Sequence, residues 1–291
     1  MTDVGGATLL LRSGDLVVIP TETVYGLAAD ALNPEAVRKI FIAKGRPTNH
    51  PLIVHIGSAE AAEPLAETAD PRFHALAKAL WPGPLAIILP KKPCVPDEVT
   101  GGHPTVALRC PDHPLTLAVL HAGLALAAPS ANRFTRLSPT RVEDLDPELL
   151  AHVALVLDGG SCRVGIESTV LDLSGGAPRL LRPGAVTADQ IQAVIDEEVQ
   201  EGPGETPSPG QHPRHYQPRT PLELVAELEG RPGIAREEDP AHYAAQLYAR
   251  LHELDRLNLK SILIESPPTE ESWKAVWDRL RRASNVPPSR S

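Results

Sequence analysis

Short apolar runs of strand length alternate with helix-length segments through the first 200 residues, and this pattern constrains the fold more than any other feature. Leu16–Ile19 and Leu85–Leu89 are apolar enough to be buried strands. A helix is expected to start after Asn33, which can cap it, with Pro34 at its first position. So many strands with few helices predict an α/β fold with one large, twisted, mixed β-sheet and flanking helices.

The same reasoning assigns the other elements of this region. They are strands over residues 51–56, 105–110, 124–128, 154–157, 169–173 and 180–181, and helices over residues 70–81 and 115–121. Thr140 with Glu143, and Thr187 with Gln190, have the spacing of capping boxes, so each pair predicts a helix start.

The composition changes after residue 200, where proline and glycine become frequent. This stretch predicts a linker stiffened by proline. A strand, helix, strand and helix are expected beyond it, over residues 222–225, 241–254, 261–265 and 271–283. The expected organisation is therefore a large domain, a linker and a small C-terminal α/β domain, at residues 1–200, 201–221 and 222–291.

Charge and hydropathy narrow the functional classes. The net charge of −9 disfavours stable tRNA binding by this chain alone, because phosphate contacts require a basic surface. No apolar run approaches the roughly 20 residues of a membrane span, and the first residues lack the basic start of a signal peptide. We therefore expect a cytoplasmic protein without membrane contacts. The three cysteines are far apart, so we expect three buried apolar side chains and no disulfide or zinc site.

Lys44-Gly45-Arg46 is a candidate phosphate-binding motif. Lys44 follows Val37 by seven residues, so helical spacing places it on the apolar face that also carries Ile40. A lysine there needs an anionic partner or a path to solvent. A cation that merely interacts with the helix dipole is the alternative explanation.

Further polar clusters follow expected strands, where ligands often bind in α/β proteins. Thr21 and Thr23 lie in a segment that is expected to lead from a strand into a helix. Ser130 and Asn132 follow another strand, and Arg182 ends a third. Each cluster alone is also compatible with a solvated turn. The chain contains no P-loop, dinucleotide fingerprint or kinase motif, so a nucleotide site must be assembled from scattered residues.

Nine motifs occur together in one order. They are PTETVYGL (20–27), KGRP (44–47), HPLIVHI (50–56), WPGPL (81–85), TVALRCP (105–111), APSAN (128–132), GIEST (165–169), LLRPG (180–184) and RHYQP (214–218). With this set the chain resembles the threonylcarbamoyl-adenylate synthase family in its long form. That form has a YrdC-like domain with a concave open cleft, a linker and a C-terminal Rossmann-like domain. The C-terminal domain here is shorter than is usual in the family.

The resemblance implies a nucleotidyltransferase reaction. L-Threonine, bicarbonate or CO2, and ATP with Mg²⁺ would give threonylcarbamoyl-AMP and pyrophosphate, and a separate transferase complex would modify tRNA with the product (t6A). Two alternatives are a YrdC-like carbamoyltransferase with another carbamoyl donor and a non-catalytic RNA-binding paralogue. The first usually carries extra modules, and the second predicts a basic concave face.

The resemblance also assigns site residues. ATP is expected to contact Lys44, Arg46, Thr105, Ser130, Asn132, Ser138, Arg182 and Tyr216. Threonine is expected to contact Thr23, His55, Arg109, Ala128 and Ser168, with Arg109 as the partner of its carboxylate. The catalytic residues are expected to be Lys44, Arg46 and Tyr25. The segment with His215 and Tyr216 is expected to act as a lid, and His50 departs from the usual family residue.

Overall fold

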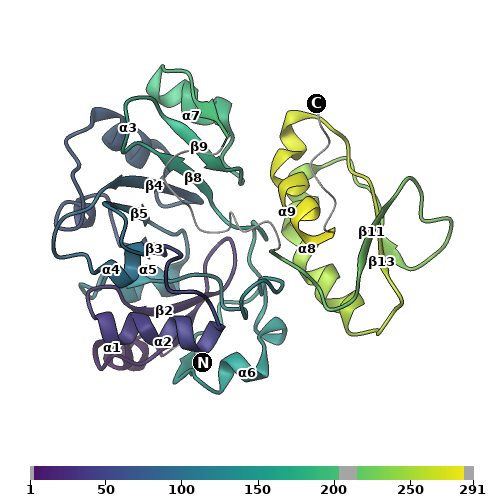
Figure 1. Cartoon of the computed structure of the whole chain (residues 1–291), viewed down its shortest axis with the longest axis horizontal. Helices are drawn as coiled ribbons and strands as arrows, with labels where there is room; N and C mark the ends of the chain where they lie inside the picture. The colour runs from purple at the N-terminus through teal and green to yellow at the C-terminus, as the bar shows by residue number, and fades with distance from the viewer. Residues whose placement is uncertain (1–2, 203–214, 285–291) are drawn as a thin grey trace.

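The large mixed sheet is confirmed by the computed structural model, which describes residues 3–202 and 215–284. Ten strands form this sheet (Figure 1). In spatial order they are β10 (Gln200–Glu201), β9 (Arg179–Arg182), β8 (Thr169–Asp172), β4 (Leu85–Pro90), β5 (Thr105–Arg109), β3 (Ile53–His55), β6 (Leu126–Ala127), β2 (Gly26–Asp30), β1 (Val17–Ile19) and β7 (Leu155–Val156). Four neighbouring pairs are parallel, namely β10–β9, β8–β4, β5–β3 and β1–β7, and the other pairs are antiparallel.

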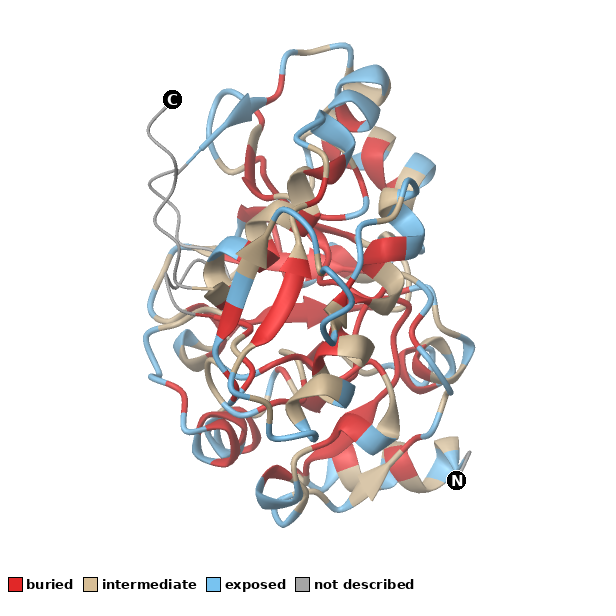
Figure 2. Ribbon diagram, turned by 90° about the vertical axis from the view of Figure 1, so that its right-hand side faces the viewer, coloured by how far each residue is buried: buried red, intermediate tan, exposed pale blue. Residues whose placement is uncertain are grey.

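Helices pack on both faces of this sheet. They are α1 (Val4–Arg12), α2 (Pro34–Lys44), α3 (Pro71–Leu80), α4 (Asp97–Thr100), α5 (Pro114–Leu120), α6 (Pro147–Leu150) and α7 (Ala188–Ile195). Side chains alternate along a strand, so Val106 and Leu108 join the main core with α2 and α3, while Ala107 faces the other way. On that second face α1 and α5 cover one end of the sheet, at strands β1 and β6. Figure 2 shows the buried residues concentrated in the strands and in the inner sides of the helices.

Helix α2 confirms the predicted capping and periodicity. The side chain of Asn33 accepts hydrogen bonds from the backbone amides of Glu35 and Ala36. The helix ends at Gly45, whose φ of 60° suits glycine best. Because 3.6 residues make one turn, Lys44 is buried on the same face as the apolar residues of this helix. The end of α2 therefore places the amino group of Lys44 in the interior.

The small C-terminal domain contains a three-stranded parallel sheet in the order β11 (Leu222–Val225), β13 (Ile262–Glu265) and β12 (Gly233–Ile234). Helices α8 (Pro240–Asp255) and α9 (Lys274–Ser284) lie between this sheet and the large domain (Figure 1). Their core is shared with the large domain, because Val24, Leu137 and Ile166 belong to the same cluster of buried residues as Tyr248 and Leu280. The two domains are thus held together by apolar packing.

Three expectations were wrong. The segment with Thr21 and Thr23 leads into strand β2 and not into a helix. Thr140 is buried and starts no capping box, since the short 3₁₀ helix Val142–Asp144 has Arg141 before it and no side-chain cap. Cys94 is exposed, whereas Cys110 and Cys162 are buried as expected. The second capping box, at Thr187, is present and begins α7.

Most of the predicted linker, residues 203–214, lies outside the described residues. Two short 3₁₀ helices, Glu60–Ala62 and Glu271–Trp273, complete the elements of the described chain. No helix among residues 3–202 and 215–284 is long and apolar enough to cross a bilayer.

Candidate active site

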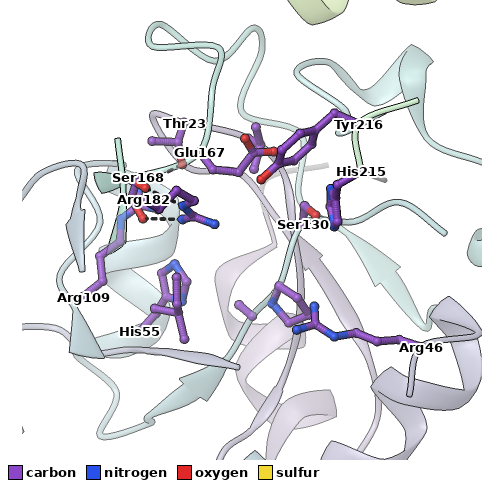
Figure 3. A pocket seen from close by; sticks show the side chains of 14 residues that line it. Thr23, Arg46, His55, Arg109, Ser130, Glu167, Ser168, Arg182, His215 and Tyr216 are labelled. Atoms are coloured by element: carbon purple, nitrogen blue, oxygen red, sulfur yellow. Dashed lines mark hydrogen bonds between the residues drawn. The ribbon is translucent and has the colours of Figure 1, made fainter. Parts of the chain in front are cut away.

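A polar cavity of about 50 Å³ lies where several strands of the large sheet end (Figure 3). His55 and Arg109 end the parallel strands β3 and β5 and are paired in register. Arg182 ends β9, and Glu167 and Ser168 directly precede β8. The lining residues are Thr23, Val24, Arg46, Ile53, His55, Arg109, Ala128, Pro129, Ser130, Glu167, Ser168, Arg182, His215 and Tyr216. Two arginines at strand ends, Arg109 and Arg182, and a third in the loop after α2, Arg46, therefore come together around one small space.

Arg109 is fixed by three groups. Its Nη2 atom donates to Thr23 Oγ1 at 2.9 Å, and its Nε atom donates to the carbonyl of Gly83 at 3.3 Å. Nη2 also lies 2.8 Å from Glu22 Oε1, an ion pair without the alignment of a hydrogen bond. Both side chains are almost fully buried. Glu22 therefore compensates much of the charge of Arg109 and fixes the direction of its guanidinium group.

His55 presents a neutral ring to the cavity. Burial, and then the charge of Arg109, lower the pKa of His55 to about 3. Its Nδ1 atom is buried and has no hydrogen-bond partner among the described residues. A neutral imidazole nitrogen without a partner can accept a hydrogen bond from an ammonium or hydroxyl group of a ligand.

Arg182 and Ser168 form another part of the cavity wall. Arg182 donates from Nε to the carbonyl of Ser168 at 2.9 Å and from Nη2 to Ser168 Oγ at 3.1 Å. Burial lowers the pKa of Arg182, yet a guanidinium group keeps its charge in proteins. The pair thus holds a cation beside a hydroxyl, a combination that suits a phosphate or carboxylate ligand.

The KGR motif divides into two roles. Lys44 Nζ donates to the carbonyls of Ser130 and Asn132, both at 2.5 Å, so it holds the loop after β6 in place. Arg46 reaches the cavity, where Nη2 donates to the carbonyl of Pro51 at 2.9 Å and Nε has no partner among the described residues. Arg46 is therefore the member of the motif with a donor available for a ligand.

His215 and Tyr216 cover the cavity from the other side. Their ring centroids are 4.1 Å apart, and Tyr216 has the unusual φ of 61°. The following residue, Gln217, donates its backbone amide to the carbonyl of Thr135 at 2.9 Å. We call residues 215–217 the strap, since they cross the mouth of the site and are anchored on one side to the loop at residue 135.

Most of the predicted site residues line this one cavity. They are Thr23, Arg46, His55, Arg109, Ala128, Ser130, Ser168, Arg182 and Tyr216. Their individual roles toward ATP or threonine stay predictions.

The other predicted residues do not line the cavity. Tyr25 donates its hydroxyl to the carbonyl of Gly160 at 2.7 Å, Lys44 bonds to the loop carbonyls, and Asn132 donates its side-chain amide to two carbonyls of its own loop. Ser138 donates its hydroxyl to Glu167 at 2.5 Å, so it contacts a residue that lines the cavity. Thr105 begins β5, and the four steps along the strand from Thr105 to Arg109 span about 13 Å. Thr105 is therefore not among the residues that line the cavity, and its role toward ATP stays a prediction.

Sequence reasoning assigned no role to two buried carboxylates, Glu22 and Glu167. Both lie inside motifs of the set that resembles the family, PTETVYGL and GIEST. A carboxylate between apolar residues and hydroxyls was the available signal, because a buried carboxylate needs a cationic partner. Each has an arginine partner in the structure.

Comparison with known proteins identifies the family. Residues 9–184 match a family model named for Sua5, YciO and YrdC and described as "Telomere recombination". Residues 186–285 match a second model, "Threonylcarbamoyl-AMP synthase, C-terminal domain". A threonylcarbamoyl-AMP synthase of Bacillus subtilis is 39% identical, with 96% of this chain and 92% of that protein covered. The chain belongs to the threonylcarbamoyl-AMP synthase family.

A relative from Pyrococcus abyssi extends this finding to the structure. The threonylcarbamoyl-AMP synthase of that organism is 38% identical, over 94% of this chain and 92% of the relative. The crystal structure of P. abyssi Sua5 complexed with L-threonine superposes with a TM-score of 0.87 at 35% identity, and it covers 97% of this chain and 94% of that one. The fold resembles that protein across both domains, so the C-terminal domain here keeps the family arrangement despite its predicted shortening.

Proposed function

We propose that this chain is an L-threonylcarbamoyladenylate synthase. Its substrates would be L-threonine, bicarbonate or dissolved CO2, and ATP, and its products threonylcarbamoyl-AMP and pyrophosphate. The observation that supports this most is the convergence of Arg46, Arg109 and Arg182 on one cavity in a member of this family. Such a site suits two anionic reactants, because each guanidinium group can bind a carboxylate or a phosphate.

The proposed chemistry needs no protein nucleophile. The amine of threonine attacks CO2, loses a proton and becomes a carbamate. A carbamate oxygen then forms a bond to the α-phosphorus of ATP, and the bond from that phosphorus to the bridging oxygen breaks, which releases pyrophosphate. The protein contributes by aligning the two anions and by stabilising charge on the phosphoryl oxygens.

Within this proposal the cavity has two sides. Threonine would lie against Thr23, His55 and Arg109, where the neutral imidazole can accept a hydrogen bond and the arginine can pair with the carboxylate. The phosphates would lie toward Arg46 and Arg182. The relative from P. abyssi, which was crystallised with L-threonine, supports the assignment of the amino acid.

Mg²⁺ would accompany the nucleotide. Among the described residues no group of three histidine, cysteine or acidic side chains is placed to hold a metal ion. Glu167, the carboxylate among the described lining residues, already bonds to Ser138, Tyr248 and Arg279. Magnesium held largely by phosphate oxygens and water fits this residue set, since Mg²⁺ retains several of its waters in such sites.

The size of the cavity implies an opening step. Binding sites for small molecules usually enclose about 300–1,000 Å³. The cavity between the strap and the sheet encloses about 50 Å³, which is too little for ATP and threonine together. We propose that the strap moves aside for ATP and closes over the reactants, which keeps water from a labile mixed anhydride.

The proposed product requires an acceptor. We propose that a separate transferase complex in the cytoplasm moves the threonylcarbamoyl group to tRNA. The net charge of −9 supports a division of labour in which this chain does not hold tRNA itself. The domain of residues 1–200 would carry most of the catalytic site, and the domain of residues 222–291 would pack against it.

One assay tests the function. The purified protein is incubated with ATP, Mg²⁺, bicarbonate and single amino acids, and released pyrophosphate is followed over time. We expect release that depends on both threonine and bicarbonate. Release with threonine that does not exceed release with serine or with no amino acid would contradict the proposal.

A further inference from the structure

A buried ion pair joins the C-terminal domain to the wall of the cavity. Arg279 on α9 donates from Nε to Glu167 Oε2 at 2.9 Å and from Nη2 to the carbonyl of Glu167 at 3.1 Å. The side chain of Arg279 is 1% exposed and that of Glu167 is 8% exposed. Glu167 lines the cavity, so one contact separates helix α9 of the C-terminal domain from the site.

The guanidinium group of Arg279 is almost completely satisfied by its surroundings. Its Nη1 atom donates to the carbonyl of Pro183 at 2.7 Å and lies 3.0 Å from Asp278 Oδ2. Pro183 directly follows Arg182, another residue of the cavity. Arg279 thereby holds two segments of the large domain, the loop before β8 and the loop after β9, in a fixed relation.

The charge of Glu167 depends on this contact. Burial opposes ionisation of the carboxyl group, but the charges of Arg279 and then Arg182 outweigh burial, and the pKa of Glu167 is lowered. A carboxylate accepts bonds from Ser138 at 2.5 Å and from the hydroxyl of Tyr248 at 3.1 Å. Without Arg279, Arg182 would be the remaining arginine whose charge lowers the pKa of Glu167, and Arg182 also bonds to Ser168.

The same guanidinium group supports the strap. Arg279 Cζ lies 5.4 Å from the centroid of the Tyr216 ring, and Tyr248 packs against that ring with centroids 5.8 Å apart. A cation near an aromatic ring stabilises the ring's position. One side chain of the C-terminal domain therefore contacts both the acidic group of the wall and the aromatic group of the strap.

We infer that Arg279 is a positioning residue of the active site: it neutralises and orients Glu167 and supports Tyr216, so the nucleotide side of the site is incomplete without the C-terminal domain. This inference rests on the proposed function, because it takes the nucleotide phosphates to lie beside Arg46 and Arg182. An unpaired carboxylate next to those phosphates would repel them.

The test compares four full-length variants, Arg279→Met, Arg279→Lys, Glu167→Gln and the double variant Glu167→Gln/Arg279→Met, with Arg281→Met as the matched control. Arg281 is an exposed arginine on the same helix that packs on Trp277. The readouts are KM for ATP, KM for threonine, kcat, and the dissociation constant of a non-hydrolysable ATP analogue. Thermal unfolding establishes that each variant is folded.

We expect Arg279→Met to raise KM for ATP and the analogue's dissociation constant by about tenfold or more, because removal of one partner leaves a buried charge uncompensated. KM for threonine should change less than threefold. The double variant should recover most of the lost affinity for nucleotide, since the unpaired carboxylate is gone. Arg281→Met should behave as the wild type.

Three results would overturn the inference. The first is a folded Arg279→Met variant with unchanged nucleotide affinity. The second is a double variant that remains as weak as Arg279→Met, which would indicate a purely structural role. The third applies if Arg279→Met does not fold: Arg279→Lys keeps the charge, and a folded lysine variant with a tenfold loss would exclude the electrostatic role.

The same measurements distinguish a failure of the proposed function from a failure of the inference about Arg279. A wild type that binds the analogue but releases no threonine-dependent pyrophosphate contradicts the function alone, and the binding readout still tests Arg279. A wild type that binds no nucleotide contradicts both.

Discussion

Arg46 reaches the cavity with few protein partners. Its Nη2 atom donates to one backbone carbonyl, and its Nε atom has no partner among the described residues. Burial, and then the charge of Arg182, lower the pKa of Arg46 to about 10, so it remains a cation at neutral pH. A buried cation whose N–H donor has no protein partner can bind an anionic ligand.

Replacement of Arg46 by alanine removes that donor. We expect Arg46→Ala to lose about 2–4 kcal/mol of transition-state stabilisation, by comparison with the loss of one preorganised donor in other enzymes. The measurement is kcat/KM for threonine-dependent pyrophosphate release. Arg38→Ala is the control, since Arg38 is an exposed arginine on α2. An Arg46→Ala enzyme within threefold of the wild type would contradict a role for Arg46 in the site.

His55 makes the stability of the protein depend on pH. Its pKa is about 3 in the folded state, through burial and then the charge of Arg109, and about 6.5 in an unfolded chain. Between these values the unfolded chain binds more protons, so stability falls as pH falls from about 6.5 toward 3.

We expect His55→Gln to reduce this acid sensitivity. Between pH 7 and pH 5, the variant should lose about 2 kcal/mol less unfolding free energy than the wild type loses, at about 1.4 kcal/mol per pH unit. Urea unfolding at the two pH values measures the difference. The exposed His152 supplies a matched control variant, His152→Gln. Equal slopes for His55→Gln and the wild type would show that His55 is not held neutral.

At the scale of elements, regular patterns were predictable and pairings were not. The Asn33 cap and the apolar face of α2 are local features, and both were predicted from the sequence. Strand β2 was missed because Gly26-Leu27-Ala28-Ala29-Asp30 has a low intrinsic strand propensity. Its strand conformation is stabilised by pairing with β1, which precedes it closely in sequence, and with β6, which is about a hundred residues away and which the local sequence does not reveal.

The proposed lid role of the strap can be tested at Tyr216. Tyr216 is buried between the cavity, Tyr248 and Arg279, and its hydroxyl has no partner among the described residues. We therefore expect Tyr216→Ala to increase hydrolysis of the adenylate, seen as a higher ratio of AMP to threonylcarbamoyl-AMP by chromatography. Tyr216→Phe keeps the ring and should keep a low ratio. An unchanged ratio and yield in Tyr216→Ala would exclude a lid role for the ring.

At the scale of the whole molecule, the two domains share one of their cores. Val24 lines the cavity and Ile166 directly precedes Glu167, and both pack with Tyr248 and Leu280 of the C-terminal domain. The sequence predicted two domains and a linker, but it could not predict that Glu167 would find its cation in α9. That pairing joins residues 112 positions apart, and such contacts leave no periodic signal.

The same limit explains which of the predicted site residues could be expected to lie together. Thr23, His55, Arg109 and Ser168 lie together because their motifs end or begin strands of one sheet. Ser138 was expected to contact the nucleotide, and that role stays a prediction. Its hydroxyl donates to Glu167, a contact that the sequence did not reveal because it joins residues 29 positions apart.

The central claim is that one site joins threonine, the carbon of bicarbonate and the adenylate of ATP. The most direct measurement supplies ¹³C-labelled bicarbonate, ATP and threonine to the wild type and analyses the nucleotide products by mass spectrometry. We predict a single adenylate product that contains both the threonine and the ¹³C atom, formed together with pyrophosphate. An adenylate of threonine without the labelled carbon, or no threonine-dependent adenylate at all, would contradict the claim.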